Sequence, residues 1–140
     1  MPQLIDHIDK IARDKSRDVL YLIFKPQPGE DELHFDYQIS KRRQQVMEWL
    51  EANKIPYFPC IGPAIAEGGF DSYSGFLYID VPFDVADAEF KRLCAYLEHP
   101  DGTSRYEDLL FAYYPLEKAL ENKHHDEPGF WDKWCEERGF

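Results

Sequence analysis

Residues 19–24 form an unbroken apolar run, Val-Leu-Tyr-Leu-Ile-Phe, and this run constrains the fold more than any other feature of the chain. Six residues are too few for a buried helix, and the run is typical of a strand that is covered on both faces. Residues 75–81, Gly-Phe-Leu-Tyr-Ile-Asp-Val, have a similar character. We therefore predict two central strands in a sheet that carries other elements on it.

The spacing of apolar residues predicts several helices around this sheet. The first covers residues 3–14, the second follows an N-cap at Ser40, and the third follows an N-cap at Asp84. Pro115 suits the first turn of a fourth helix, because its missing N–H group has no partner there in any case. A short aromatic helix with Phe130, Trp131 and Trp134 is expected to close the chain.

Two further strands are expected, and they differ in their surroundings. Residues 55–60 read as a strand interrupted by Pro56 and Pro59. Proline cannot donate a hydrogen bond to a neighbouring strand, so this strand belongs at an edge of the sheet. A loop over 61–74 follows it, and the last strand is expected over 106–114.

Between residues 19 and 114 the expected order is strand, helix, strand, strand, helix, strand. This order is typical of a ferredoxin-like βαββαβ fold, whose antiparallel sheet has the strand order 4-1-3-2. The first and third strands are central in such a sheet, and these are the two apolar runs. The second strand is an edge, which agrees with its prolines. We predict a single α+β domain over residues 1–140 with added N-terminal and C-terminal helices.

The charge of the chain excludes one class of partner. Its 140 residues carry a formal net charge of −11, so nonspecific attraction to DNA or to an anionic membrane is not expected. The start of the chain has no signal-peptide pattern, and no apolar run is long enough to cross a bilayer. The three cysteines are odd in number and widely spaced, which favours a reducing compartment. We expect a cytoplasmic protein.

The negative charge has one notable concentration. Residues 55–90 contain no Lys or Arg, although several Asp and Glu residues fall there and the segment also contains two expected strands. A folded acidic surface can dock a basic protein, and aromatic side chains can anchor the contact. The main hypothesis is therefore an acidic protein-binding module, an inhibitor or adaptor for a basic and possibly nucleic-acid-binding partner; the alternative is a solvated surface without a partner. The residues predicted to carry this docking are Glu67, Phe70, Asp71, Tyr73 and Asp84.

A second hypothesis is a small enzyme or a ligand-binding or metal-binding protein that uses a cavity beside the sheet. Glu121 and His124 have a spacing that can face one metal ion on a helix, and His125 and Asp126 follow directly. Such sites need a second motif of the same kind, and the sequence has none. No nucleophile has a recognisable base at a fixed spacing either. We therefore predict no metal, cofactor or catalytic residue, and leave enzymatic activity open.

A third hypothesis is RNA binding through one face of the sheet. Residues 74–81 loosely resemble the conserved aromatic strand of RNA recognition motifs, and Tyr21, Phe76 and Tyr78 fall where bases could stack. Leu77 and Asp80 depart from that pattern, and terminal helices covering this face are the alternative. An uncovered face would also favour a homodimer.

The run Lys41-Arg42-Arg43 at the start of a predicted helix is the last candidate. Helix N-termini bind anions, so the run could serve an anionic ligand. The competing interpretation, which we prefer, is a solvated cluster that balances the acidic residues just before it.

Overall fold

The computed structural model describes residues 5–26, 36–63, 73–130, 133 and 136. These residues form an α+β fold with a four-stranded antiparallel sheet. In chain order the elements are α1 (Ile8–Lys15), β1 (Val19–Phe24), the 3₁₀ helix η2 (Tyr37–Ile39), α2 (Lys41–Ala52), β2 (Tyr57–Pro59), β3 (Leu77–Ile79), α3 (Ala88–Leu97), β4 (Leu109–Tyr114), α4 (Leu116–Ala119) and the 3₁₀ helix η3 (Leu120–Asp126).

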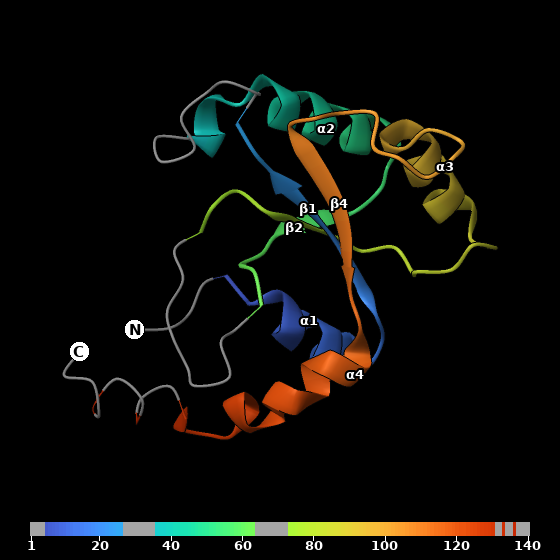
Figure 1. The fold of residues 1–140 in the computed structure, drawn as a ribbon. Coiled ribbons are helices and arrows are strands. Elements are labelled where there is room, and N and C mark those ends of the chain that lie inside the picture. The colour runs from blue at the N-terminus through green and yellow to red at the C-terminus, as the bar shows by residue number, and fades with distance from the viewer. Residues whose placement is uncertain (1–4, 27–35, 64–72, 131–132, 134–135, 137–140) are drawn as a thin grey trace.

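The sheet has the order β2-β3-β1-β4. Strand β1 pairs with β4 along its whole length, from Val19 opposite Tyr114 to Phe24 opposite Leu109. On its other side β1 pairs with β3, which in turn pairs with β2. The two apolar runs are therefore central, as predicted, and β2 and β4 are the edges (Figure 1).

Helices cover both faces of the sheet. In Figure 1, α2 and α3 lie above it, and α1 and α4 lie below it. Because neighbouring residues of a strand point to opposite faces, β1 contributes to two cores. The core under α2 and α3 includes Leu20, Leu22, Phe24, Val46, Leu50, Leu93 and Leu97. The core under α1 and α4 includes Ile8, Ala12, Val19, Tyr21, Tyr78, Tyr114 and Ala119.

The first helix begins later than the predicted range of 3–14. His7 forms a parallel β-bridge with Ile61, so the chain just before the helix is extended. The backbone N–H of Ile61 donates to the carbonyl of Asp6 at 2.9 Å, and the N–H of Ile8 donates to the carbonyl of Ile61 at 2.8 Å. These two bonds use the backbone groups that an earlier helical turn would need.

The predicted N-cap of α2 is confirmed, and that of α3 is wrong by three residues. The Ser40 hydroxyl accepts from the backbone N–H of Arg43 at 3.2 Å. For α3 the cap is Asp87, whose carboxylate accepts from the N–H of Phe90 at 2.9 Å. Asp84 instead closes a turn by accepting from the N–H of Ala86 at 2.9 Å.

The position of β2 at an edge is confirmed, and Pro56 and Pro59 lie beside and within it. The last strand is shorter than the predicted range of 106–114 and starts at Leu109. Trp131 and Trp134, which belong to the predicted closing helix, lie outside the described residues. None of the helices in the described part of the chain is long and apolar enough to span a membrane.

Candidate functional site

Only two of the five predicted docking residues, Tyr73 and Asp84, belong to the described part of the chain. Glu67, Phe70 and Asp71 lie outside the described residues. Tyr73 is half-buried; its hydroxyl accepts from Nη2 of Arg43 at 2.8 Å. Asp84 is exposed and follows β3, whereas Tyr73 precedes β3. The two described members of the set therefore lie beyond opposite ends of that strand.

The acidic segment is also partly neutralised by cations from outside it. Nη2 of Arg17 lies 2.6 Å from Oδ1 of Asp80, and Nζ of Lys15 lies 3.6 Å from Oδ2. The Tyr78 hydroxyl donates to the same carboxylate at 2.8 Å. Burial, together with this bond, raises the pKa of Tyr78 to about 12, so the phenol stays protonated. Although residues 55–90 contain no Lys or Arg, the folded surface around Asp80 therefore does contain cations from other parts of the chain.

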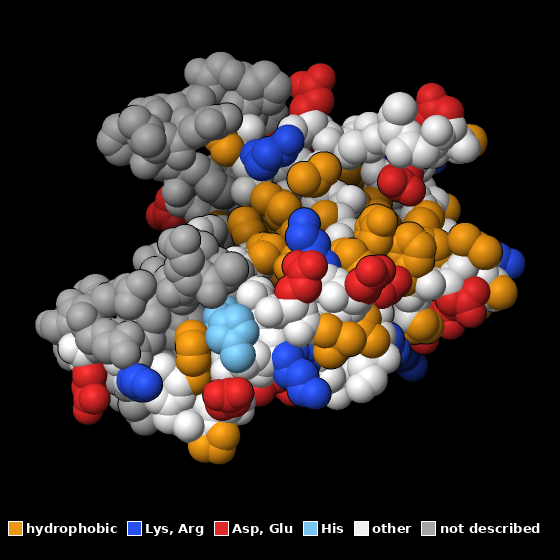
Figure 2. Space-filling model, turned by 60° about the horizontal axis from the view of Figure 1, so that its bottom comes forward, with side chains coloured by type: hydrophobic (Ala, Val, Ile, Leu, Met, Phe, Trp, Pro, Cys, Tyr) orange, Lys and Arg blue, Asp and Glu red, His pale blue; other side chains and the backbone are white. Residues whose placement is uncertain are grey.

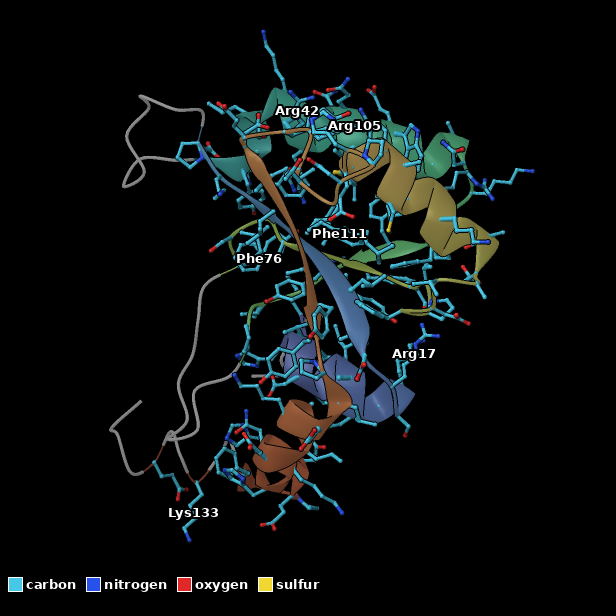
Figure 3. The ribbon with its side chains drawn as sticks, turned by 45° about the vertical axis from the view of Figure 1, so that its right-hand side comes forward. Arg17, Arg42, Phe76, Arg105, Phe111 and Lys133 are labelled. Carbon is cyan, nitrogen blue, oxygen red and sulfur yellow. The ribbon has the colours of Figure 1, made fainter. Side chains whose placement is uncertain are left out.

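The sheet face proposed for RNA is covered. Tyr21 and Tyr78 are both buried in the core under α1 and α4, and Phe76 is half-buried against it. Figure 3 shows the Phe76 side chain inside the fold, between the sheet and the α1 layer. Bases cannot stack on rings that helices already cover, so this face offers no platform for RNA. The argument for a homodimer through an open face is removed for the same reason.

Polar residues of η3 form a structural tie to α1. Arg13 of α1 binds Asp126 with two bonds, at 2.7 and 2.8 Å, and Asp9 at 3.0 Å. The bond from Arg13 holds the pKa of Asp126 below its usual value. His125 is buried and packs on the ring of Phe130, at 4.6 Å between centroids. Within the described ranges, no group of three or more His, Cys, Asp or Glu side chains is placed to hold a metal ion.

The basic run at the start of α2 is engaged within the fold. Nε of Arg42 lies 3.0 Å from Oδ1 of Asp108, and its guanidinium stacks over the ring of Tyr106 at 4.1 Å. Nε of Arg43 donates to the backbone carbonyl of Gly75 at 2.9 Å. In Figure 3, Arg42 lies close to Arg105 beside α2 and α3, far from Arg17. Arg42 and Arg43 are therefore not simply solvated, as the preferred interpretation expected, but bind partners elsewhere in the fold.

The outer edge of β4 is a surface that the sequence analysis did not single out. Among the described residues, strand β4 pairs with β1 on one side only, so alternate backbone N–H and C=O groups on the other side face outward. A hollow of about 220 Å³ opens beside it. Figure 2 shows hydrophobic side chains gathered in a band across the middle of one face of the molecule. The residues that line the hollow are Leu20, Phe83, Phe90, Cys94, Glu98, Phe111, Ala112 and Tyr113.

Aromatic side chains from three parts of the chain build this hollow. Phe83 comes from the loop after β3, and its ring lies 4.8 Å from that of Tyr113 and 5.4 Å from that of Phe90. Phe111 lies near the middle of β4, on the side of the strand that faces α3 (Figure 3). Tyr113 and Phe83 are both exposed. Exposed rings beside unpaired backbone are suited to receive another extended segment.

The electrostatics of the hollow are simple. Glu98 at the end of α3 is the one charged residue among the described residues that line it. Cys94 is half-buried beside it, and burial, together with the negative charge of Glu98, raises the pKa of its thiol. A thiol with a raised pKa is a weak nucleophile, so covalent chemistry is not favoured here. The hollow is suited to hold an apolar side chain with a cation next to it.

A weak signal for this edge is present in the sequence. Residues 109–114 contain no charge, proline or glycine, which are the devices that usually protect an exposed strand edge. The other edge strand, β2, has Pro59 within it and Pro56 directly before it. The contrast could have marked the last strand as an open edge once the order 4-1-3-2 was predicted.

Comparison with known proteins adds no family to this picture. No family model, curated protein or solved structure matches the chain. Its function must therefore be argued from the geometry of the fold.

Proposed function

We propose that this protein is an acidic protein-binding module that takes an extended segment of a basic protein partner along the free edge of β4. The observation that carries the proposal is an uncharged six-residue edge strand beside an aromatic hollow with one carboxylate. Added strands gain affinity from main-chain hydrogen bonds and specificity from pockets for alternate side chains. Strand and hollow together offer both.

The charge distribution supports a basic partner. The chain carries a net charge of −11, and Glu98 stands beside the rings that would hold an apolar side chain. A segment that alternates apolar and basic residues would place one side chain in the hollow and the next cation near this carboxylate. Association would be fast at low ionic strength and would slow as salt is added.

The acidic segment 55–90 keeps a part in this proposal. Phe83 and Phe90, which line the hollow, belong to it, and the exposed Asp84 follows Phe83 directly. Asp84 would extend the acidic rim around a bound basic segment. The contribution of Glu67, Phe70, Asp71 and Tyr73 to the same docking surface remains a prediction.

The role that fits such a surface is that of an inhibitor or adaptor, because a captured segment is withdrawn from its other contacts. We further propose a ferredoxin-like core, which the strand order β2-β3-β1-β4 supports. A cytoplasmic location is proposed as well, and the free thiols of Cys60 and Cys94 support it.

A synthetic peptide tests the binding mode directly. The probe is the acetylated and amidated peptide KVKFKVK, titrated against the labelled protein at low and high salt. We expect the amide signals of residues 109–114 to shift in NMR spectra and their hydrogen exchange to slow. The same peptide with alternate N-methylated amides should bind at least about tenfold more weakly, because each lost backbone bond costs about 1 kcal/mol. Equal binding of both peptides would refute strand addition.

Matched variants on the two sheet edges locate the contact. Tyr113 on β4 is 53% exposed and Phe58 on β2 is 51% exposed, so each can be changed to Lys at similar structural cost. We expect Tyr113→Lys to weaken binding of the peptide about tenfold and Phe58→Lys to change it less than twofold. Equal effects of the two variants would contradict a site at β4. Concentration-dependent doubling of the mass, abolished by Tyr113→Lys, would instead assign the edge to a second copy.

A further inference from the structure

A cavity of about 360 Å³ lies between α1 and β2, at the edge of the sheet that is farthest from β4. Cavities of this size suit small molecules, and binding sites usually combine apolar walls with a few polar groups. The described residues that line the cavity are Ile5, Asp6, Ile11, Asp14, Lys15, Phe58, Pro59 and Tyr78. This cavity belongs neither to the β4 edge nor to the predicted docking residues.

The charges around the cavity favour a cation. Asp14 is engaged by Lys10, with 2.9 Å between Nζ and Oδ2, and the charge of Lys15 is directed to Asp80 at 3.6 Å. Asp6 makes no side-chain hydrogen bond or ion pair that we find among the described residues. Its backbone is held by the bond from the N–H of Ile61 at 2.9 Å. The cavity thus contains a well-positioned carboxylate that a bound cation can pair with.

The charge of Asp6 also acts on a neighbouring amine. The pKa of Lys10 is raised, first by its hydrogen bond to Asp14 and in addition by the charge of Asp6. A group that stabilises the protonated form of one amine will stabilise another amine placed nearby. Asp6 therefore supplies a negative potential at the cavity. Lys10 forms its hydrogen bond with Asp14 and not with Asp6.

The apolar wall of the cavity is an aromatic surface. The ring of Phe58 lies 6.3 Å from that of Tyr78 with an angle of 23° between the ring planes. Tyr78 is buried and forms the floor, whereas Phe58 stands exposed on the edge strand. Ile11 and Pro59 complete the apolar side. A flat ring can lie against Phe58, and a cation near its face gains a further attraction.

We propose that this cavity binds a small organic cation of the arylalkylamine class, with its amine at Asp6 and its ring against Phe58. The cavity is large enough for one bicyclic ring with a two-carbon amine chain. The proposal is independent of strand addition at β4, because it uses different residues on another edge of the sheet.

The test compares two ligands that share a ring and differ in charge. Tryptamine should bind with a Kd on the order of 1 mM or below, as expected for a ligand of about a dozen heavy atoms. It should shift the amide signals of Ile11, Lys15 and Phe58 in NMR spectra. Indole-3-propionic acid, with the same ring and the opposite charge, should bind at least about tenfold more weakly. Equal binding of the two, or shifts that map elsewhere, would overturn the proposal.

Variants separate specific binding from attraction to an acidic protein. Asp6→Asn and Phe58→Ala should each weaken tryptamine about fivefold to tenfold. Glu48→Gln is the matched control, because it removes one exposed carboxylate from α2 on the far side of the sheet (Figure 1). If Glu48→Gln weakens binding as much as Asp6→Asn does, the attraction is nonspecific and the assigned site is wrong.

Discussion

The tie that Arg13 forms between α1 and the segment 119–126 predicts a large effect of a single substitution, Arg13→Met. The Arg13 side chain is 5% exposed, and that of Asp9, its partner at 3.0 Å, is 0% exposed. Nη1 of Arg13 also donates to the carbonyl of Ala119 in α4 at 3.1 Å. The substitution keeps most of the side-chain volume and removes the charge together with these bonds.

The magnitude follows from the burial of Asp9. Removing one member of a buried ion pair leaves the other charge without compensation and costs about 3–5 kcal/mol. Asn122 still donates to Asp9 at 3.0 Å, which places the expected loss near the lower end of that range. The loss of the pair with Asp126 adds about 0–1 kcal/mol, because that carboxylate is partly exposed. A loss of about 3–4 kcal/mol is a large share of the stability of an ordinary domain.

Urea denaturation measures this loss, and α1 contains its own control. Lys10 and Asp14 have the same four-residue spacing as Asp9 and Arg13, but their side chains are 39% and 54% exposed. Lys10→Met should therefore cost only about 0.3–0.5 kcal/mol. Asp9→Leu combined with Arg13→Met should recover at least about 1 kcal/mol relative to Arg13→Met alone. If Arg13→Met costs no more than Lys10→Met, the reasoning from burial is refuted.

The same tie has a pH dependence of known sign. Because the pKa of Asp126 is lowered in the fold, its contribution to stability is present above the unfolded pKa of about 3.9 and is lost as the pH falls through the folded value. Unfolding measured below pH 4 should therefore show a steeper loss of stability for the natural protein than for Arg13→Met. Parallel curves for the two proteins would contradict this assignment.

Two glycine substitutions and one alkylation reaction test the fold at single positions. Gly75 has a φ of +91°, and a Cβ there would lie 2.5 Å from the Cβ of Tyr37, whereas Gly102 has a φ of +90° and nothing within 4 Å. We expect Gly102→Ala to cost about 1–2 kcal/mol and Gly75→Ala clearly more in urea denaturation, because only the latter adds a collision. Equal costs would show that the chain around Gly75 gives way. Burial raises the pKa of the Cys60 thiol to about 12, so Cys60 should resist iodoacetamide in the folded protein at pH 8, while the half-buried Cys94 reacts faster. Mass spectrometry of the alkylated peptides measures both rates, and faster labelling of Cys60 would refute its burial.

Much of the fold could be predicted because its signals are local. The apolar run 19–24 required two covered faces, and the prolines beside and within β2 required an edge. Ser40 directly precedes α2 and caps it, as its position in the sequence predicts. Before α3, in contrast, Asp84 and Asp87 are equally suited to the role. Which of them caps the helix depends on where the chain turns after β3, and no local pattern specifies that.

The candidate sites were harder to predict because they depend on contacts between distant residues. Arg17 and Asp80 are 63 positions apart, and only the folded sheet brings them together. The exposure of β4 follows from strand order and not from the composition of the strand itself, which reads as core. The bridge between His7 and Ile61, which delays α1, is likewise invisible to helical periodicity. Local patterns therefore identified the elements, and tertiary pairing decided which surfaces remained free.

The unequal edges of the sheet limit how large any assembly built on it can become. Continued growth by strand pairing requires that both edges of the sheet can pair with another strand. The prolines at β2 hinder such pairing at that edge. A sheet that accepts a new strand at one edge alone limits its own growth. Once that edge is occupied, no further strand can be added. Open-ended fibres built on this sheet are thereby disfavoured, even though the chain displays an uncharged hydrophobic strand to its surroundings.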